Sequence, residues 1–199
     1  MVRHGETAWN ASHRFQGHTD IPLSDKGQAQ ALALARALRG TRIHAVYASD
    51  LARAAQTARH IAHPHDLSVV TDARLREFAF GQWEGLTWEQ IVRRFPEAAQ
   101  FGFLSVRDYR PPGGETLDVV KQRVGAFLDA LSAQDGTAVV VSHAGALHAA
   151  LAYLFGDAYF QWKVRLMPAS ITRLCLAPDR PPEVISLNEL DHLGAEPSA

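Results

Sequence analysis

The sequence has little cysteine, little net charge and no long apolar run, and each shortage excludes a class of protein. Cys175 is the only cysteine, so a framework of disulfides is excluded and a reducing compartment is favoured. The 20 basic and 21 acidic side chains nearly cancel, which argues against a surface that binds nucleic acid. The longest apolar stretch, from Ala144 to Phe155, is interrupted by His148 and is too short to span a membrane.

Export signals, repeats and biased segments are also missing. No basic region followed by an apolar run opens the chain, so we expect a cytoplasmic protein. A chain of 199 residues can bury roughly 70% of the surface that its unfolded form exposes, which favours a single domain over residues 1–199. Only the tail, residues 194–199, has the composition of a disordered end.

The sequence does contain a regular alternation of predicted helices and strands. Ser24, Ser49 and Thr116 are suitable N-cap residues, and Gly156 is a suitable stop for the last helix. Apolar periodicity predicts helices at residues 25–39, 50–62, 117–131 and 145–155. Short β-rich runs predict strands at residues 43–48, 67–71, 137–142, 171–177 and 184–187, after a short opening strand.

This alternation predicts an α/β fold. Strands that are apolar on both faces and alternate with helices indicate a three-layer sandwich, with a mainly parallel central sheet and helices on both faces. The last two strands follow each other without a helix, so we expect an antiparallel edge. Residues 78–114 fit the alternation poorly, although they hold a capping box at Thr87 and Gln90 and a turn cluster at residues 111–114. We expect this segment to be a lid-like insertion.

Chemically active side chains follow the predicted strands. Arg3 and His4 follow the opening strand, and Arg53 follows the second. Glu77 follows the third strand, and His143 follows the fourth. Because ligands bind at the carboxyl ends of strands in open α/β sheets, we expect these side chains to gather at one edge. The set suits a phosphoryl group, since arginine forks match its oxygens, an imidazole can attack phosphorus and a carboxyl can protonate a leaving oxygen.

Several motifs around these residues resemble those of the histidine phosphatase superfamily, which includes the cofactor-dependent phosphoglycerate mutases. The opening block Val2–Thr7 reads VRHGET, and the resemblance continues in the family's order over nearly the whole chain. The further matching blocks are Trp9-Asn10, Phe15-Gln16-Gly17, Pro22-Leu23-Ser24, Ser49–Ala54 with Gln56-Thr57-Ala58, Glu77 with Gly81–Gly85, Gly114-Glu115-Thr116, and Ser142-His143.

The resemblance implies a two-step mechanism at these positions. His4 would attack phosphorus and form a phosphohistidine, and Glu77 would protonate the leaving oxygen and then activate water. The resemblance implies a phosphate site made of Arg3, Asn10, Gln16, the Gly17 backbone, Arg53 and His143. It also implies that His143 is catalytic, together with His4 and Glu77. Arginine and imidazole supply the positive charge, so no metal and no cofactor is expected.

The resemblance leaves several functions open. We predict a phosphomonoesterase acting on a small phosphorylated metabolite, because the chain is short for a mutase and Gly113–Thr116 matches the GGE[ST] pattern of the phosphatase members. The alternatives are a cofactor-dependent phosphoglycerate mutase and, from another class, a non-catalytic module that binds a phosphorylated ligand. Neither nucleic acid nor a membrane is expected as a partner, and a homodimer is left open.

Some residues also have simpler interpretations. Taken alone, His143 is more readily interpreted as a hydrogen-bonded core histidine than as a site residue, and Glu6 and Glu84 compete with Glu77 for the role of acid. The histidines at residues 60–65 are interrupted by Pro64 and lack cysteine or carboxylate partners at a metal-binding spacing, so we expect no metal there.

The sequence also departs from the family in two places. Only two residues precede Arg3, so either the first strand is very short or the start lies upstream. In addition, His148 stands where many relatives have arginine.

Overall fold

The computed structural model describes residues 1–100, 110–177 and 179–194. Part of the predicted insertion, residues 101–109, and most of the predicted tail lie outside the described residues. The strands are β1 (Val2–Arg3), β2 (Ala45–Ala48), β3 (Val69–Thr71), β4 (Ala138–Ser142), β5 (Ile171–Ala177) and β6 (Arg180–Glu189). The α-helices are α1 (Ala8–Ala11), α2 (Asp25–Leu38), α3 (Ala52–Ala62), α4 (Trp88–Arg94), α5 (Leu117–Ser132) and α6 (Ala144–Phe155).

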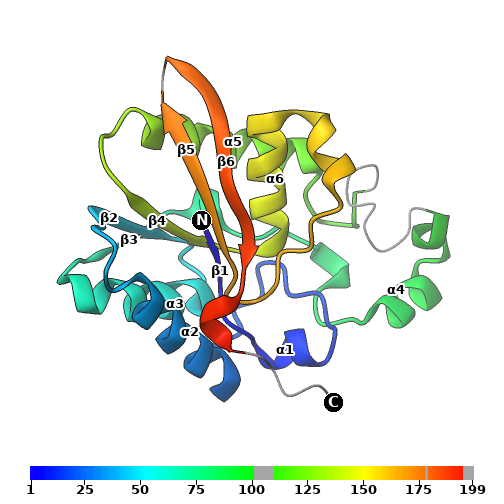
Figure 1. Cartoon of the computed structure of the whole chain (residues 1–199). Coiled ribbons are helices and arrows are strands. Elements are labelled where there is room, and N and C mark those ends of the chain that lie inside the picture. The colour runs from blue at the N-terminus through cyan, green and yellow to red at the C-terminus, as the bar shows by residue number, and fades with distance from the viewer. Residues whose placement is uncertain (101–109, 178, 195–199) are drawn as a thin grey trace.

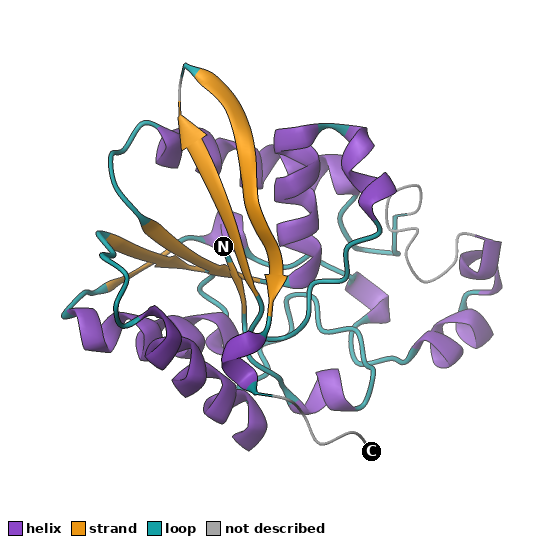
Figure 2. Cartoon of the chain, in the orientation of Figure 1, coloured by secondary structure: helices purple, strands orange, loops and turns teal. Residues whose placement is uncertain are grey.

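The strands form a single six-stranded sheet in the order β3-β2-β4-β1-β5-β6. The four strands from β3 to β1 pair in parallel, and β5 runs antiparallel to both β1 and β6. The mainly parallel sheet and its antiparallel edge are therefore confirmed, and the long β5-β6 hairpin is clear in Figure 2. In the centre, Val2 pairs with Val141, which brings the carboxyl ends of β1 and β4 side by side.

Helices cover both faces of the sheet, which confirms the three-layer architecture (Figure 1). Helices α2 and α3 pack together on one face, and α5 and α6 pack together on the other. Strand β4 shows why both faces are apolar. Val139 and Val141 belong to the core under α2 and α3, whereas Val140 belongs to the core under α5 and α6. Successive side chains of a strand point to opposite faces, so an uninterrupted valine run serves both layers.

Most predicted helix starts are confirmed. Ser24 caps α2 and Thr116 caps α5, each through a side-chain oxygen that accepts a backbone N–H. Thr87 and Gln90 form the predicted capping box of α4.

The predicted cap at Ser49 is wrong. Its N–H donates to Val141 O and continues the sheet, so α3 begins only at Ala52. The Ala52 N–H instead donates to Asp20 Oδ1 at 2.7 Å. Because this carboxylate comes from a distant loop, the substitute cap has no local signal in the sequence. Strand β2 is two residues shorter at its start than predicted, and β6 is longer at both ends than the predicted run.

The described part of the insertion contains α4 and two short 3-10 helices, and aromatic rings anchor it. Phe15 meets Phe80 and Trp83 edge to face, with ring centroids 5.1 and 5.8 Å apart. Along the described ranges, no helix is both long enough and apolar enough to cross a membrane. The 3-10 segments are η1 (His63–His65), η2 (Ala73–Leu75), η3 (Gly81–Trp83), η4 (Pro96–Gln100), η6 (Asp157–Trp162) and η7 (Asp191–Leu193).

Candidate active site

His4 lies directly after β1, at the carboxyl end of a central strand. Its N–H donates to Ser142 O of β4 at 2.9 Å, and its buried ring places Nδ1 2.6 Å from Gly5 O. Because a carbonyl oxygen only accepts, Nδ1 carries the proton and Nε2 keeps its lone pair. Burial, followed by the charges of Arg53 and Arg3, holds the pKa of His4 well below its ordinary value. The ring is therefore neutral at pH 7, with Nε2 as a free base.

Arg53 and His143 form a buried pair from two different helices. His143 is the N-cap residue of α6, and its Nδ1 accepts a hydrogen bond from Arg53 Nε at 3.1 Å. The two terminal nitrogens of Arg53 donate to Thr19 O and Gly17 O. Burial, then the charge of Arg53, keeps the pKa of His143 well below its ordinary value. A neutral ring whose Nδ1 accepts must carry its proton on Nε2, so His143 presents an N–H donor on that side.

Arg3 completes a concentration of positive charge. Its Nη1 donates to Leu166 O at 2.6 Å, but its Nε is buried with no hydrogen-bond partner, as is Nε2 of His143. Burial lowers the pKa of Arg3 to about 10, and the charge of Glu77 opposes part of this shift. Buried donors are nearly always paired, so two unpaired ones in a cluster with two guanidinium groups indicate a site for an oxygen-rich anion.

The carboxylate of Glu77 is held at the start of α6. Its Oε1 accepts from the N–H groups of Phe78 and Ala146 at 2.9 and 3.0 Å, and its Oε2 accepts from Gly145 N at 3.1 Å. A Cβ at position 145 would lie 2.4 Å from Oε1, so glycine at this position lets the carboxylate approach the helix. The first N–H groups of a helix have no partner within the helix, and here two of them fix the direction of the Glu77 carboxylate.

The rings of His4 and His143 lie with their centroids 5.0 Å apart, so the strand ends bring both imidazoles together with the two arginines. This combination of donors and a free imidazole nitrogen can bind and transfer a phosphoryl group. A family model described as the histidine phosphatase superfamily, branch 1, matches residues 1–189. This chain belongs to the histidine phosphatase superfamily. The resemblance identified from the motifs is thereby confirmed over nearly the whole sequence.

Relatives and solved structures of the superfamily resemble the chain along most of its length. A "probable phosphoglycerate mutase GpmB" of an Enterobacter species is 37% identical, over 87% of this chain and 82% of the relative. Phosphoserine phosphatase 1 of Hydrogenobacter thermophilus is 32% identical, over 98% and 93%. The structure of a mycobacterial glucosyl-3-phosphoglycerate phosphatase in complex with VO3 has a TM-score of 0.82 at 32% identity, over 94% and 96%. Phosphatases are found both among the relatives and among the solved structures. This histidine phosphatase is therefore an enzyme that acts as a phosphatase.

The three predicted neutral groups of the phosphate site lie close to this core. Thr7 donates through its hydroxyl to Gln16 Oε1 at 3.0 Å and caps α1 in a capping box with Asn10. Gly17 lies beside them and accepts from Arg53 through its carbonyl. The fold therefore groups all three around Thr7 and Arg53, and their contact with phosphate stays a prediction.

The two competing carboxylates have other partners in this histidine phosphatase. Glu6 forms an ion pair with Lys26 at 3.5 Å. Glu84 accepts from the N–H groups of His18, Thr19 and Phe80, and it thereby fixes the loop whose carbonyls hold Arg53. Sequence reasoning missed this anchoring role, because three of the bonds of Glu84 go to backbone N–H groups, which nearly every residue type offers.

Thr57 is a second residue that sequence reasoning did not assign to the site. Its hydroxyl donates to Arg53 O at 2.8 Å and accepts from Gly5 N at 3.1 Å, so it ties α3 to the turn that follows His4. A signal was available. Position 57 is four residues after Arg53 and therefore lies on the same face of α3.

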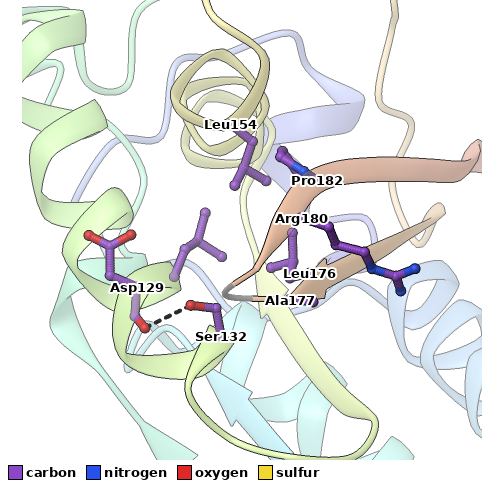
Figure 3. Close-up of a pocket in the computed structure, with 8 residues that line it drawn as sticks. Asp129, Ser132, Leu154, Leu176, Ala177, Arg180 and Pro182 are labelled. Carbon is purple, nitrogen blue, oxygen red and sulfur yellow. Dashed lines mark hydrogen bonds between the residues drawn. The ribbon is translucent and has the colours of Figure 1, made fainter.

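A pocket of about 180 Å³ lies far from this cluster, between α5, α6 and the β5-β6 hairpin (Figure 3). Leu154 on its wall is ten residues beyond the start of α6, so about 15 Å of helix separates it from the His143 end. The polar groups on its wall are already engaged. Asp129 accepts from the Tyr153 hydroxyl, and Arg180 contacts Cys175 Sγ.

The histidine cluster of residues 60–65 shows no ligand arrangement. Nε2 of His60 lies 2.9 Å from Gln28 Oε1, and His63 is exposed at the end of α3. Across residues 1–100, 110–177 and 179–194, no three His, Cys, Asp or Glu side chains are gathered as a metal site would need.

Proposed function

We propose that this protein is a metal-independent phosphomonoesterase that acts through a phosphohistidine on His4. The observation that carries the proposal is the pairing of His4 Nδ1 with Gly5 O, which leaves Nε2 free as a nucleophile beside two unpaired buried donors. A neutral imidazole with a fixed tautomer can attack phosphorus without first losing a proton. The lowered pKa of His4 keeps that form dominant at neutral pH.

The positive groups would bind the phosphoryl oxygens. Arg3 Nε and His143 Nε2 supply N–H donors that are already desolvated, and Arg53 supplies charge from a fully buried position. Phosphoryl transfer depends mainly on positioning and on stabilising charge over the equatorial oxygens. Donors fixed before the substrate arrives suit this task, because they need no reorganisation during the reaction. Asn10, Gln16 and the Gly17 backbone would add neutral contacts.

Glu77 would act first as the acid and then as the base. In the first step the P–O bond breaks, its electron pair goes to the leaving oxygen, and the Glu77 carboxyl supplies the proton while His4 Nε2 bonds to phosphorus. In the second step the carboxylate takes a proton from water, which attacks phosphorus and releases His4. Proton transfer of this kind contributes about 10²–10⁴-fold to a rate.

The comparisons support a small phosphorylated hydroxy compound as the substrate class. The relatives with phosphatase names act, by those names, on phosphoserine and on glucosyl-3-phosphoglycerate. Both compounds are esters of an aliphatic hydroxyl, whose alkoxide must be protonated as it leaves. That requirement fits an enzyme that holds an acid beside its nucleophile.

The direct test is hydrolysis of p-nitrophenyl phosphate and of phosphoserine in the presence of a chelator. We expect full activity without metal, and a loss of at least about 10³-fold in kcat for His4→Ala. His63→Ala is the matched control, because His63 is exposed and distant from the site, and its activity should be unchanged. Activity that survives His4→Ala, or that appears only after metal is added, would contradict the proposal.

A mutase is the second candidate, because the GpmB relative is 37% identical. The two activities share the phosphohistidine and differ in whether water or a second substrate receives the phosphoryl group. We propose that hydrolysis dominates. Incubation with 3-phosphoglycerate and a trace of 2,3-bisphosphoglycerate decides between them, since isomerisation faster than phosphate release would identify a mutase.

We also propose a cytoplasmic location, with a small phosphorylated substrate as the ligand and neither nucleic acid nor a membrane as a partner. The single cysteine supports a reducing compartment, and the balanced charge supports the absence of a nucleic-acid partner. A homodimer is compatible with these features, and sedimentation of the full chain measures it.

A further inference from the structure

The segment that carries Glu77 has no regular structure of its own. Residues 76–80 lie between η2 and η3 and belong to no helix or strand. Backbone groups in such a segment need partners from elsewhere, and without them the direction of a side chain is poorly fixed. A catalytic acid must be held to within a fraction of an ångström, so the source of these partners matters for catalysis.

One guanidinium binds two carbonyl groups of this segment, on either side of the Arg76-Glu77 junction, and a third carbonyl just before it. Arg123, on α5, donates to the carbonyl oxygens of Arg74, Arg76 and Glu77 at 2.8, 2.6 and 2.8 Å. Only 17% of its side chain is exposed. A planar fork with five N–H groups can make these bonds together, whereas an ammonium at one point cannot.

A carboxylate fixes the guanidinium in turn. Glu115 accepts from Arg123 Nε at 3.0 Å and from Nη2 at 2.8 Å, and its Oε2 also accepts from Ala79 N at 2.9 Å. Burial alone would raise the pKa of Glu115, but the hydrogen bonds from Arg123 and Ala79 hold it below its ordinary value. Glu115 therefore stays charged at neutral pH, and the pair binds the backbone on both sides of Glu77 along the chain.

The backbone and the side chain of Glu77 are held from opposite sides. The backbone carbonyl accepts from Arg123 and also lies 2.9 Å from His18 Nε2, while the side-chain carboxylate binds the start of α6. Oε1 accepts two N–H groups and Oε2 accepts one, from Gly145, so Oε2 keeps room to hold a proton. Because the backbone is bound from α5 and the carboxylate is bound at α6, the Glu77 side chain is held in one orientation.

We propose that Arg123 is a positioning residue for Glu77, and that its guanidinium, held by Glu115, sets the acid in line with the leaving oxygen. The inference rests on the proposed role of Glu77 as the proton donor. Arg123 itself touches neither substrate nor phosphorus. Its contribution is the placement of the Glu77 O–H, whose proton passes to the leaving oxygen as the P–O electron pair moves onto that atom.

The test compares two leaving groups. p-Nitrophenolate leaves without needing a proton, whereas the alkoxide of β-glycerophosphate needs one, so loss of acid placement should reduce kcat/KM mainly for the second substrate. For Arg123→Met we expect a loss on β-glycerophosphate at least about tenfold greater than the loss on p-nitrophenyl phosphate. Arg123→Lys keeps the charge without the fork and should show the same bias.

Two further variants make the outcome decisive. Arg74→Met is the matched control, because Arg74 binds Asp72 and the Ala126 carbonyl and makes no side-chain bond to the Glu77 segment. Arg74→Met should reduce kcat/KM for both substrates by the same factor, or for neither. Glu115→Gln weakens the grip on Arg123 without removing the guanidinium, and it replaces Arg123→Met if that variant does not fold.

The reference variant is Glu77→Gln, which separates the two hypotheses. If Glu77→Gln shows no bias against β-glycerophosphate, the proposed role of Glu77 itself is wrong. The other outcome is that Glu77→Gln shows the bias, but the folded Arg123 and Glu115 variants reduce kcat/KM for both substrates by the same factor, or for neither. In that case Arg123 has only a structural role and the inference is overturned. A shared bias supports it.

Discussion

At the residue scale, Arg53 makes three directed hydrogen bonds from a fully buried position. A lysine cannot reach His143 and both loop carbonyls at once, so Arg53→Lys should misplace His143 and weaken the anion site. We expect kcat/KM for p-nitrophenyl phosphate to fall by about 10²-fold, and the inhibition constant of vanadate to rise in parallel. Arg59→Lys, exposed on the same helix, should change neither value. Unaltered vanadate inhibition in Arg53→Lys would remove Arg53 from the anion site.

Residues that follow strands were predictable, whereas residues that support them were not. His4 and His143 come directly after the central strands β1 and β4, and the geometry of a parallel sheet places such residues at one edge. Arg123 lies within the predicted helix α5 and Glu84 in the turn after η3, and both bind backbone N–H or C=O groups of other segments. Every residue carries those groups, so no pattern in the sequence indicates which arginine or glutamate will bind them.

At the element scale, the first turn of α6 combines two functions in three residues. His143 is the N-cap residue of the helix, and Gly145 and Ala146 in the same turn donate their N–H groups to Glu77. Gly145→Ala should therefore affect activity more than stability. Alanine improves helix propensity by roughly 0.5–1 kcal/mol, which offsets the shift of Glu77 and Phe78 away from the new Cβ. We expect kcat/KM for β-glycerophosphate to fall about tenfold, with little change in unfolding temperature.

The control for this substitution is Gly40→Ala. A Cβ at position 40 meets no atom within 4 Å, so activity should be unchanged. Full activity of Gly145→Ala on the alkyl ester would mean that the carboxylate of Glu77 does not need its position at α6. Thermal unfolding of both variants shows whether an activity loss reflects the site or the fold.

Element boundaries depended on whether the cap was local. Ser24 and Thr116 accept N–H groups three residues ahead, so their helices could be predicted from adjacent sequence. The start of α3 could not, because the oxygen that accepts from Ala52 belongs to Asp20. Ser49, the predicted cap, continues the sheet instead, because its N–H pairs with Val141 O of β4 and the helix starts three residues later.

At the scale of the whole molecule, three histidines with lowered pKa values, two of them buried and one half-buried, make folding sensitive to acid. The pKa values of His4 and His143 lie well below the ordinary value, and burial, followed by the charge of Arg3, lowers that of His148 to about 4. Below their ordinary pKa these groups bind protons in the unfolded chain but not in the folded one. The stability that these neutral histidines contribute is therefore fully present above about pH 6.5, and it is lost as the pH falls toward 4.

His148→Gln isolates one part of this effect. The shift of His148 corresponds to a free energy of unfolding on the order of 3 kcal/mol between pH 7 and pH 4. Glutamine does not titrate and can still bond to the Tyr159 hydroxyl, which lies 2.5 Å from His148 Nδ1. Urea unfolding at a series of pH values should give a shallower acid slope for the variant. Identical slopes would show that His148 does not couple folding to pH.

The central claim is that phosphate passes through His4, and chemical quenching during turnover tests it most directly. Wild-type protein mixed with a radiolabelled phosphomonoester and quenched in alkali should carry a label that is stable to base and released by acid, as expected for a phosphoramidate. The same treatment of His4→Asn should leave the protein unlabelled. A wild-type protein that turns over substrate with no label, or a variant that still becomes labelled, would contradict the account.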